Sequence, residues 1–422
     1  MKLLHVSDLH LDTPFSGIAK QDYQLQQKLI QAPFESFERC VSIAINQKVD
    51  LMLVSGDIYD ATKQTIAAKH FFFQQMNRLK QAEIPVVIGH GNHDYYEPNH
   101  LSMNYPDNVH LFEEELVNYF DITTKNNETI RVYGFSYNHR WIKERMVEKY
   151  PVNPRTTDFT IGLLHGSLDS TGSEQANYAP FSLQDLLSKE YDYWALGHIH
   201  QAMVLNEVPL IQYPGIIQGK NAKESGDKGA YIVELRQNQP TLNEFVSLAS
   251  IVWETANLYC DYDWEQQRII SEIQDIVTNY EAESEGTQQS YLLTIHLNDA
   301  HKLSNALQEQ IESGQLAEVF QPNYEAKRFT KVVKIKLVTD NQLEVFEYDH
   351  LLNESYLETL QEFKDGALYD TVIKEITKHP VMRKWLRDSI LTEDLKNDAL
   401  EKANQRLLQT LRIKSEEDNH EN

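Results

Sequence analysis

Residues 3–12 read LLHVSDLHLD, an apolar run that ends in Asp8 and, two positions later, His10. In extended backbone, side chains two residues apart point to the same face, so we expect Asp8 and His10 to converge just beyond the end of a buried strand. An isolated D-x-H pair is more often a surface turn than a metal site. The pair gains weight because four further apolar runs of this chain end in residues of the same kinds.

The other four apolar runs end at residues 55, 88, 164 and 196. The polar residues that follow them are Asp57, Asn92, His93, His165, His198 and His200. In open α/β sheets, sites form at the carboxyl ends of strands, so these residues can meet in one cleft although they lie far apart in the sequence. Taken alone, His165 is more often a buried, hydrogen-bonded histidine than a ligand. The combined order D-x-H, G-D-x-x-D, G-N-H-D, strand-end His and G-H-x-H favours one shared site.

The types of these side chains indicate which metal they suit. Carboxylate, carboxamide and imidazole groups without a thiolate suit Mn²⁺ or Fe²⁺, and Zn²⁺ remains an alternative. There are enough ligands for two ions. If an aspartate is shared between them, two ions about 3.5–4 Å apart can bind a phosphoryl group and a bridging hydroxide. Gly56, Gly91 and Gly197 allow the backbone to turn sharply where the strands end.

These five motifs resemble those of the calcineurin-like metallophosphoesterases, and the resemblance covers about residues 1–235. Within that superfamily the chain is most similar to the SbcD-like DNA repair exonucleases, in particular to their YhaO-type branch. The SDLHLD opening carries this finer similarity. So does the glycine-rich segment after residue 212, through Tyr213, Pro214, Gly215, Gln218, Gly219, Glu224, Gly226, Lys228 and Gly229.

The resemblance implies a role for each site residue. One ion would be bound by Asp8, His10, Asp57 and His200, and the other by Asp57, Asn92, His165 and His198. His93 would bind the phosphate and act as general acid for the leaving oxygen, which agrees with the need for an acid near the ions. Two positions depart from the family pattern. Asp60 stands where many members carry histidine, and Lys220-Asn221 stands where we expect Arg-His, which changes the expected phosphate contact.

The fold class expected from the resemblance is α/β (α+β). Residues 1–246 would form a four-layer metallophosphoesterase β-sandwich flanked by helices. Residues 247–340 show a β-α-β-α-β order typical of a small α+β domain, which would be the capping domain. Residues 341–422 are predicted to be helical, with a disordered tail over 414–422. Lys and Arg outnumber Asp and Glu eight to five over residues 383–414. These helices would bind an ATPase partner or fold on their own domain.

Periodicity also makes local predictions. Helices are expected over residues 23–48, with a break at Pro33, and over residues 62–82. Residues 208–212 and 229–235 resemble a closing pair of strands, and residues 281–289 an acidic turn. Residues 327–336 form the most basic strand, which could lie along a phosphate backbone or be a solvated face. Apolar residues over 37–45 and 71–76 could pair two subunits or belong to the core.

Composition limits the class of protein. At 422 residues, the chain predicts two or three domains. Cys40 and Cys260 form no CxxC pattern, and a reducing compartment fits. The N-terminus does not resemble a signal peptide, and no apolar run approaches the length of a membrane span, so we expect a cytoplasmic protein. The net charge of −24 argues against a surface generally coated by nucleic acid, but it does not exclude a nuclease with a local basic strip.

The leading functional hypothesis is a Mn²⁺-dependent DNA exonuclease of DNA repair, a homodimer that acts with an SMC-like ATPase subunit of the SbcC/YhaN-like type. Hydrolysis would use two ions and a metal-bridged hydroxide. A phosphoesterase for a small phosphodiester such as a cyclic nucleotide is the second hypothesis, since the same motifs recognise phosphate and not base. The third is a non-enzymatic scaffold that binds DNA ends or a partner. The long chain after residue 235 argues against the second, and the full ligand set against the third.

Overall fold

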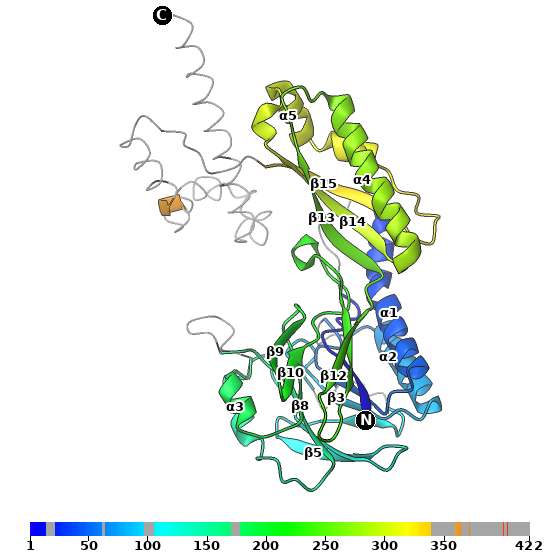
Figure 1. The fold of residues 1–422 in the computed structure, drawn as a ribbon, viewed down its shortest axis with the longest axis vertical. Coiled ribbons are helices and arrows are strands. Elements are labelled where there is room, and N and C mark those ends of the chain that lie inside the picture. The colour runs from blue at the N-terminus through cyan, green and yellow to red at the C-terminus, as the bar shows by residue number, and fades with distance from the viewer. Residues whose placement is uncertain are drawn as a thin grey trace, which may run out of the picture. The chain divides into compact units, whose positions relative to one another are not determined.

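The structure is a computed structural model that describes residues 1–13, 22–60, 64–96, 105–169 and 178–338, with only isolated positions beyond them. One compact unit contains Met1–Leu258, Trp264–His296 and Asn305–Lys336. A second contains Tyr259–Asp263, Leu297–Ser304 and Leu337–Asn422. The predicted C-terminal helices and disordered tail lie outside the described residues. Figure 1 shows the fold.

The first sheet has six strands in the order β12-β11-β1-β2-β3-β4. Their bounds are β12 Leu242–Ser247, β11 Gly229–Glu234, β1 Lys2–Val6, β2 Leu51–Ser55, β3 Val86–Gly89 and β4 Val109–Leu111. Strands β1 to β4 are parallel, and β11 pairs antiparallel with both β1 and β12. The carboxyl ends of β1, β2 and β3 therefore lie at one edge of the sheet.

The second sheet also has six strands, in the order β5-β6-β7-β8-β10-β9. Their bounds are β5 Asn118–Thr123, β6 Thr129–Gly134, β7 Phe159–His165, β8 Tyr193–Gly197, β10 Leu210–Tyr213 and β9 Met203–Glu207. The four central strands are parallel, and the edge strands β5 and β9 are antiparallel to their neighbours. Strand β7 ends at the predicted ligand His165, and β8 ends at Gly197, one residue before His198.

Three apolar layers hold the two sheets and their helices together. Leu3, Leu53 and Val87 of the first sheet share a core with residues of the second, such as Ile161 and Ala195. Helices α1 (Tyr23–Asn46) and α2 (Ile66–Gln81) cover the other face of the first sheet. Helix α3 (Leu183–Leu187) contributes to the core on the outer face of the second. This helix–sheet–sheet–helix order is the four-layer sandwich expected from the sequence.

Helix α1 is continuous, so the predicted break at Pro33 is wrong. A proline inside a helix removes one hydrogen bond and costs about 3 kcal/mol or more. Packing on both sides of Pro33 outweighs this cost. Leu25 and Leu29 pack in a cluster with Ile251 and Leu292, which belong to a small third sheet described below. Phe37 and Val41 pack in the core under the first sheet. Phe37 and Val41 are therefore part of the chain's own core.

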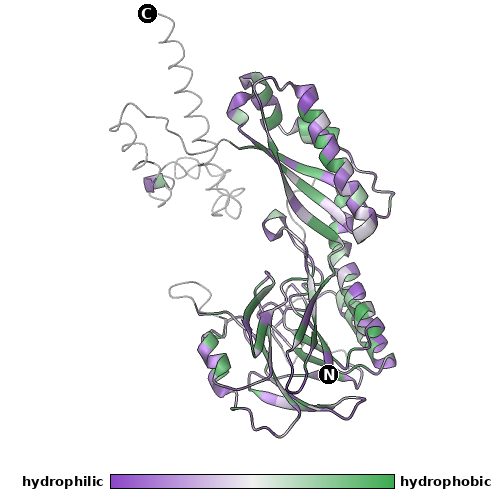
Figure 2. Ribbon diagram, viewed as in Figure 1, coloured by the Kyte–Doolittle hydropathy of each residue, from purple (hydrophilic) through white to green (hydrophobic). Residues whose placement is uncertain are grey.

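The third sheet has the order β13-β14-β15. Strands β13 (Ile251–Tyr259), β14 (Ser290–Asn298) and β15 (Thr330–Val338) alternate with helices α4 (Gln266–Thr287) and α5 (Asn305–Glu312), as predicted. The predicted acidic turn over 281–289 is wrong, because α4 continues to Thr287. Ile269, Ile273, Val277 and Ser284 lie buried at helical spacing, so the acidic residues occupy the exposed side of the last two turns. Figure 2 shows the same alternation of hydrophilic and hydrophobic residues along α4.

The predicted closing pair of strands is also wrong. Strand β10 joins the second sheet, parallel to β8, whereas β11 joins the first sheet, antiparallel to β1. The two strands are neighbours in sequence but belong to different sheets. The chain between them, which contains Lys220 and Glu224, therefore crosses from one sheet to the other.

Candidate metal centre

The loops that follow β1 and β2 hold each other in place. The backbone nitrogen of Asp8 donates to the carbonyl of Gly56 at 3.1 Å, and that of His10 donates to the carbonyl of Asp57 at 3.0 Å. Asp8, His10 and Asp57 have positive φ angles of 53°, 43° and 50°. Asp8 and His10 thus converge through left-handed backbone and not through the extended backbone that we expected. Residues other than glycine adopt this region uncommonly, and such residues cluster at functional sites.

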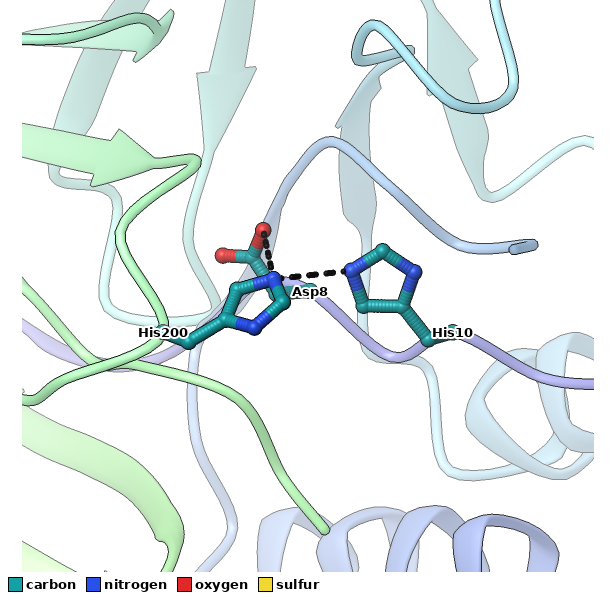
Figure 3. A group of neighbouring side chains, drawn as sticks. All are labelled: Asp8, His10 and His200. Atoms are coloured by element: carbon teal, nitrogen blue, oxygen red, sulfur yellow. Dashed lines mark hydrogen bonds and ion pairs between the residues drawn. The ribbon is translucent and has the colours of Figure 1, made fainter. Parts of the chain in front are cut away.

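The first group of ligand-type atoms comes from Asp8, His10 and His200, whose atoms all lie within 4.8 Å of one another (Figure 3). Nε2 of His10 lies 3.1 Å from Nε2 of His200, and Nε2 of His200 lies 4.0 Å from Oδ1 of Asp8. Asp8 is fully buried, and its Oδ1 has no hydrogen-bond partner among the described residues. A buried carboxylate oxygen without a partner is costly unless a cation or a water satisfies it.

The outer nitrogens of both histidines face carboxylates. Nδ1 of His200 lies 2.6 Å from Oε1 of Glu224. Nδ1 of His10 lies 3.0 Å from Oδ1 of Asp60, an ion-pair distance, although the contact is off the line of a hydrogen bond. Each carboxylate favours a proton on Nδ1, which leaves Nε2 of the neutral ring as an acceptor. Two acceptor nitrogens then face the same point, which suits a cation.

The second group of ligand-type atoms comes from Asp57, His165 and His198, again within 4.8 Å of one another. The side-chain oxygen of Asn92 lies 2.9 Å from Nε2 of His165 and 3.0 Å from Nδ1 of His198. Nδ1 of His165 contacts the carbonyl of Ser55 at 2.9 Å, which favours the proton there and directs Nε2 toward the group.

Asp57 lies between the two groups. Its Oδ2 is 3.8 Å from Nε2 of His10 and 3.5 Å from Nε2 of His165, and the residue is 1% exposed. Burial alone would raise the pKa of Asp57, but the His165 and His10 rings hold it well below its usual value. The carboxylate is therefore charged, and among the residues that the structure describes it is the side chain placed to belong to both groups.

The same charges act on the two histidines of the second group. Burial alone would lower the pKa of His165, but Asp57 and Asp8 raise it to about 9. For His198, burial and the neighbouring His165 lower the pKa to about 4. The second group therefore carries a proton on His165 that a bound cation would replace.

Glycine is required where the loops meet the ligands. A β-carbon on Gly91 would collide with Oδ1 of Asp57 and Cε1 of His165. Asp94, fully buried, fixes this loop by accepting hydrogen bonds from the backbone nitrogens of Gly91 and Ile58, both at 2.8 Å. Nδ1 of His90 lies 3.2 Å from Oδ2 of Asp94, so His90 contacts the carboxylate that fixes the loop.

His93 lies at the edge of the centre. Its backbone nitrogen donates to Oδ1 of Asp57 at 2.9 Å, and its Nδ1 contacts the carbonyl of Asp60 at 2.9 Å. Its ring meets that of His10 edge-on, with the ring centres 4.9 Å apart. His93 is thus beside both groups, and His10, Asp60 and His93 themselves form a third set of neighbouring ligand-type atoms.

The structure thus brings together every site residue that the sequence singled out, namely Asp8, His10, Asp57, Asn92, His93, His165, His198 and His200. Their donor set, oxygen and imidazole nitrogen without thiolate, fits two divalent cations. The sequence did not identify the supporting roles of Asp60, Asp94 and Glu224. Asp60 and Asp94 are the last residues of the motifs GDIYD and GNHD, so their positions in the sequence could have indicated a role at the site. Glu224 does not directly follow a strand, and only the three-dimensional fold brings it to His200.

Residues 1–202 match the calcineurin-like phosphoesterase family, so this part of the chain is a calcineurin-like metallophosphoesterase domain. With this domain and the ligand groups above, the chain is a metal-dependent phosphoesterase. Over 397 residues it is 29% identical to the uncharacterized metallophosphoesterase YhaO of Bacillus subtilis, covering 91% of this chain and 92% of that protein.

Two further relatives have names that refer to nucleic acid. The chain is 25% identical to the DNA double-strand break repair protein Mre11 of Sulfurisphaera tokodaii, covering 83% of this chain and 88% of that protein. It is 22% identical to a subunit of the nuclease SbcCD of Staphylococcus epidermidis, covering 59% of this chain and 70% of that protein. Among the described residues, no helix is both long enough and apolar enough to cross a bilayer.

Proposed function

We propose that this phosphoesterase is a Mn²⁺-dependent DNA exonuclease of DNA repair. The observation that carries the proposal is the placement of Asp57 between two groups of ligand atoms, with His93 beside both. Two divalent ions in such a centre stabilise charge on a phosphoryl group and activate water. The mixture of carboxylate, amide and imidazole ligands suits Mn²⁺.

The chain's own residues have distinct tasks in this proposal. Asp8, His10, Asp57 and His200 would hold one ion, and Asp57, Asn92, His165 and His198 the other. His93 would protonate the leaving oxygen. Its Nδ1 is engaged by the carbonyl of Asp60, so Nε2 is the nitrogen that can reach a substrate.

DNA as the substrate is supported by the relatives. Two of them are named for DNA break repair and as a nuclease subunit, and the similarity to the Sulfurisphaera protein extends over 83% of this chain, well beyond the catalytic domain. On β15, Lys334 is exposed and Lys336 half-buried, and neither forms an ion pair within the described part of the chain. A phosphate backbone could bind to these two charges.

The remaining expectations are part of the same proposal. A partner subunit is supported by the name of the Staphylococcus relative, which is one subunit of a nuclease. That this partner is an SMC-like ATPase is a prediction. The helices that would bind it, in residues 341–422, lie outside the described residues. A homodimer, a cytoplasmic location and the division into domains at residues 246 and 340 are predictions.

The test compares two substrates with purified full-length chain and Mn²⁺. One is end-labelled duplex and single-stranded DNA, and the other is bis-p-nitrophenyl phosphate. We expect nucleotides to be released from DNA ends by the wild type and by Asp121→Asn, which alters an exposed ion pair with Arg131. Asp57→Asn should reduce hydrolysis of both substrates by about 10³-fold or more, because it replaces the carboxylate shared by both groups with a neutral amide.

Two outcomes would contradict the proposal. Hydrolysis of the small ester without DNA cleavage, even with an SMC-like ATPase added, would favour the small-phosphodiester function. DNA binding without hydrolysis of either substrate would favour a scaffold.

A further inference from the structure

Asp60 lies where it can orient His10. Its Oδ1 is 3.0 Å from Nδ1 of His10 and 2.7 Å from Nζ of Lys220. The opposite nitrogen of His10, Nε2, faces His200 and Asp57. A carboxylate on the outer nitrogen of a ligand histidine fixes the tautomer and the direction of the ring. Because Lys220 already occupies the same carboxylate oxygen, Asp60 is better suited to this role than to binding an ion directly.

Glu224 faces the outer nitrogen of His200 in a similar way, here through a hydrogen bond. Its Oε1 is 2.6 Å from Nδ1 of His200, whose Nε2 faces Asp8. Its Oε2 accepts a hydrogen bond of 2.6 Å from the backbone nitrogen of Lys220. Both oxygens of this carboxylate are thus engaged, which holds the side chain in one orientation.

Lys220 connects the two carboxylates. Its Nζ donates to Asp60 and its backbone nitrogen donates to Glu224. The segment that carries Lys220 and Glu224 is itself fixed at both ends by Trp253 of β13. The Trp253 indole donates to the carbonyl of Gly219 at 3.1 Å, and the Trp253 carbonyl accepts from the nitrogen of Gly226 at 2.9 Å.

We propose that Asp60, Lys220 and Glu224 act as one positioning unit that directs His10 and His200 toward the first of the two ions. Lys220 then serves the metal centre through Asp60 and does not contact the substrate phosphate. The inference rests on the proposed assignment of His10 and His200 as ligands of the same ion. The positioning unit can be tested by measuring the affinity for metal, without DNA.

The test titrates metal-free, full-length protein with MnCl₂ and follows heat and the Mn²⁺ electron paramagnetic resonance signal. Asp60→Asn and Glu224→Gln keep the shape of each side chain and remove its charge. We expect each to weaken one of the two Mn²⁺ sites by about 10–100-fold and to leave the other site unchanged. The unchanged site also shows that the variant is folded.

Variants of Lys220 test its side-chain contact with Asp60 separately from its backbone contact with Glu224. Lys220→Met removes only the side-chain link to Asp60, because the backbone hydrogen bond to Glu224 remains. We expect it to weaken the same Mn²⁺ site, and Lys220→Arg to restore most of the affinity. The control is Asp107→Asn, which breaks an exposed pair with Lys80 at 3.0 Å and should change neither site.

The outcomes distinguish this inference from the proposed function. Wild-type protein that binds fewer than two Mn²⁺ ions would contradict the metal centre itself. Two ions in the wild type with unchanged affinities in Asp60→Asn and Glu224→Gln would overturn only the positioning unit. Equal weakening of both sites would overturn its assignment to the first ion.

Discussion

Nε2 of His10 and Nε2 of His200 face each other at 3.1 Å, although the two residues are 190 positions apart in the chain. Their outer nitrogens face Asp60 and Glu224, so in the neutral rings both inner nitrogens are acceptors. Two acceptors at this distance repel each other unless a proton or a cation lies between them. This relationship ties the local geometry of the centre to metal binding.

The proposed acid role of His93 predicts a dependence on the leaving group. His93→Ala should slow hydrolysis of DNA by about 10²–10⁴-fold, because the departing sugar oxygen needs a proton. A p-nitrophenyl ester, whose leaving group is stable as an anion, should be affected much less. The measurement is kcat on both substrates, together with Mn²⁺ content, which should not change. Equal losses on the two substrates would show that His93 acts in another way.

Gly91→Ala should abolish tight metal binding. The new β-carbon would collide with Asp57 and His165, which belong to different elements and cannot both move without opening the second ligand group. We expect Mn²⁺ affinity to fall by about 100-fold or more, measured by titration calorimetry. The matched control is Gly286→Ala on helix α4, where a β-carbon meets nothing within 4 Å. It should leave metal affinity intact and stabilise the helix by about 0.5–1 kcal/mol.

His5 should make stability fall in mild acid. Burial lowers the pKa of His5 from 6.5 to about 3, so the folded state keeps it neutral while the unfolded chain takes up a proton below pH 6.5. Its stabilising contribution is complete above pH 6.5 and is lost as the pH falls toward 3. At pH 5 the loss is about 2 kcal/mol. Denaturant unfolding at pH 7.5 and 5 should therefore show a smaller pH effect for His5→Gln than for the wild type. An equal effect in both proteins would contradict the assignment.

The lysines Lys334 and Lys336 of β15 should contribute to DNA affinity. Replacing both by glutamine should weaken binding and reduce the slope of log affinity against log salt by about 2, since each phosphate contact contributes about 1. Lys331→Gln is the control, because Lys331 is paired with Asp22 at 3.0 Å. Fluorescence anisotropy at several salt concentrations provides the measurement. If the double variant weakened binding no more than Lys331→Gln does, Lys334 and Lys336 would not be DNA contacts.

The centre was largely predictable from sequence, for a physical reason. Ligands such as Asp57 and His165 lie at or just after the carboxyl ends of buried parallel strands, and the edge at which such strands end is determined by their direction. Asp8 and His10 were correctly expected to lie together, but the reason given, extended backbone, was wrong. Their backbone is left-handed, and hydrogen bonds to the loop after β2 hold it there. Local sequence does not encode a partner loop almost fifty residues away.

Features that depend on tertiary packing escaped prediction. Pro33 remains inside a helix because both ends of α1 are packed, and β10 and β11 enter different sheets because each pairs with a distant strand. The role of Glu224 likewise appears only when the segment between those strands crosses from one sheet to the other and reaches His200.

The most direct test of the account is a crystal structure of the full chain grown with Mn²⁺, with anomalous scattering used to locate the ions. Two peaks about 3.5–4 Å apart are expected. One should contact Asp8, His10 and His200, the other Asn92, His165 and His198, and the carboxylate of Asp57 should contact both. A single peak, or two peaks that do not share Asp57, would contradict the central claim.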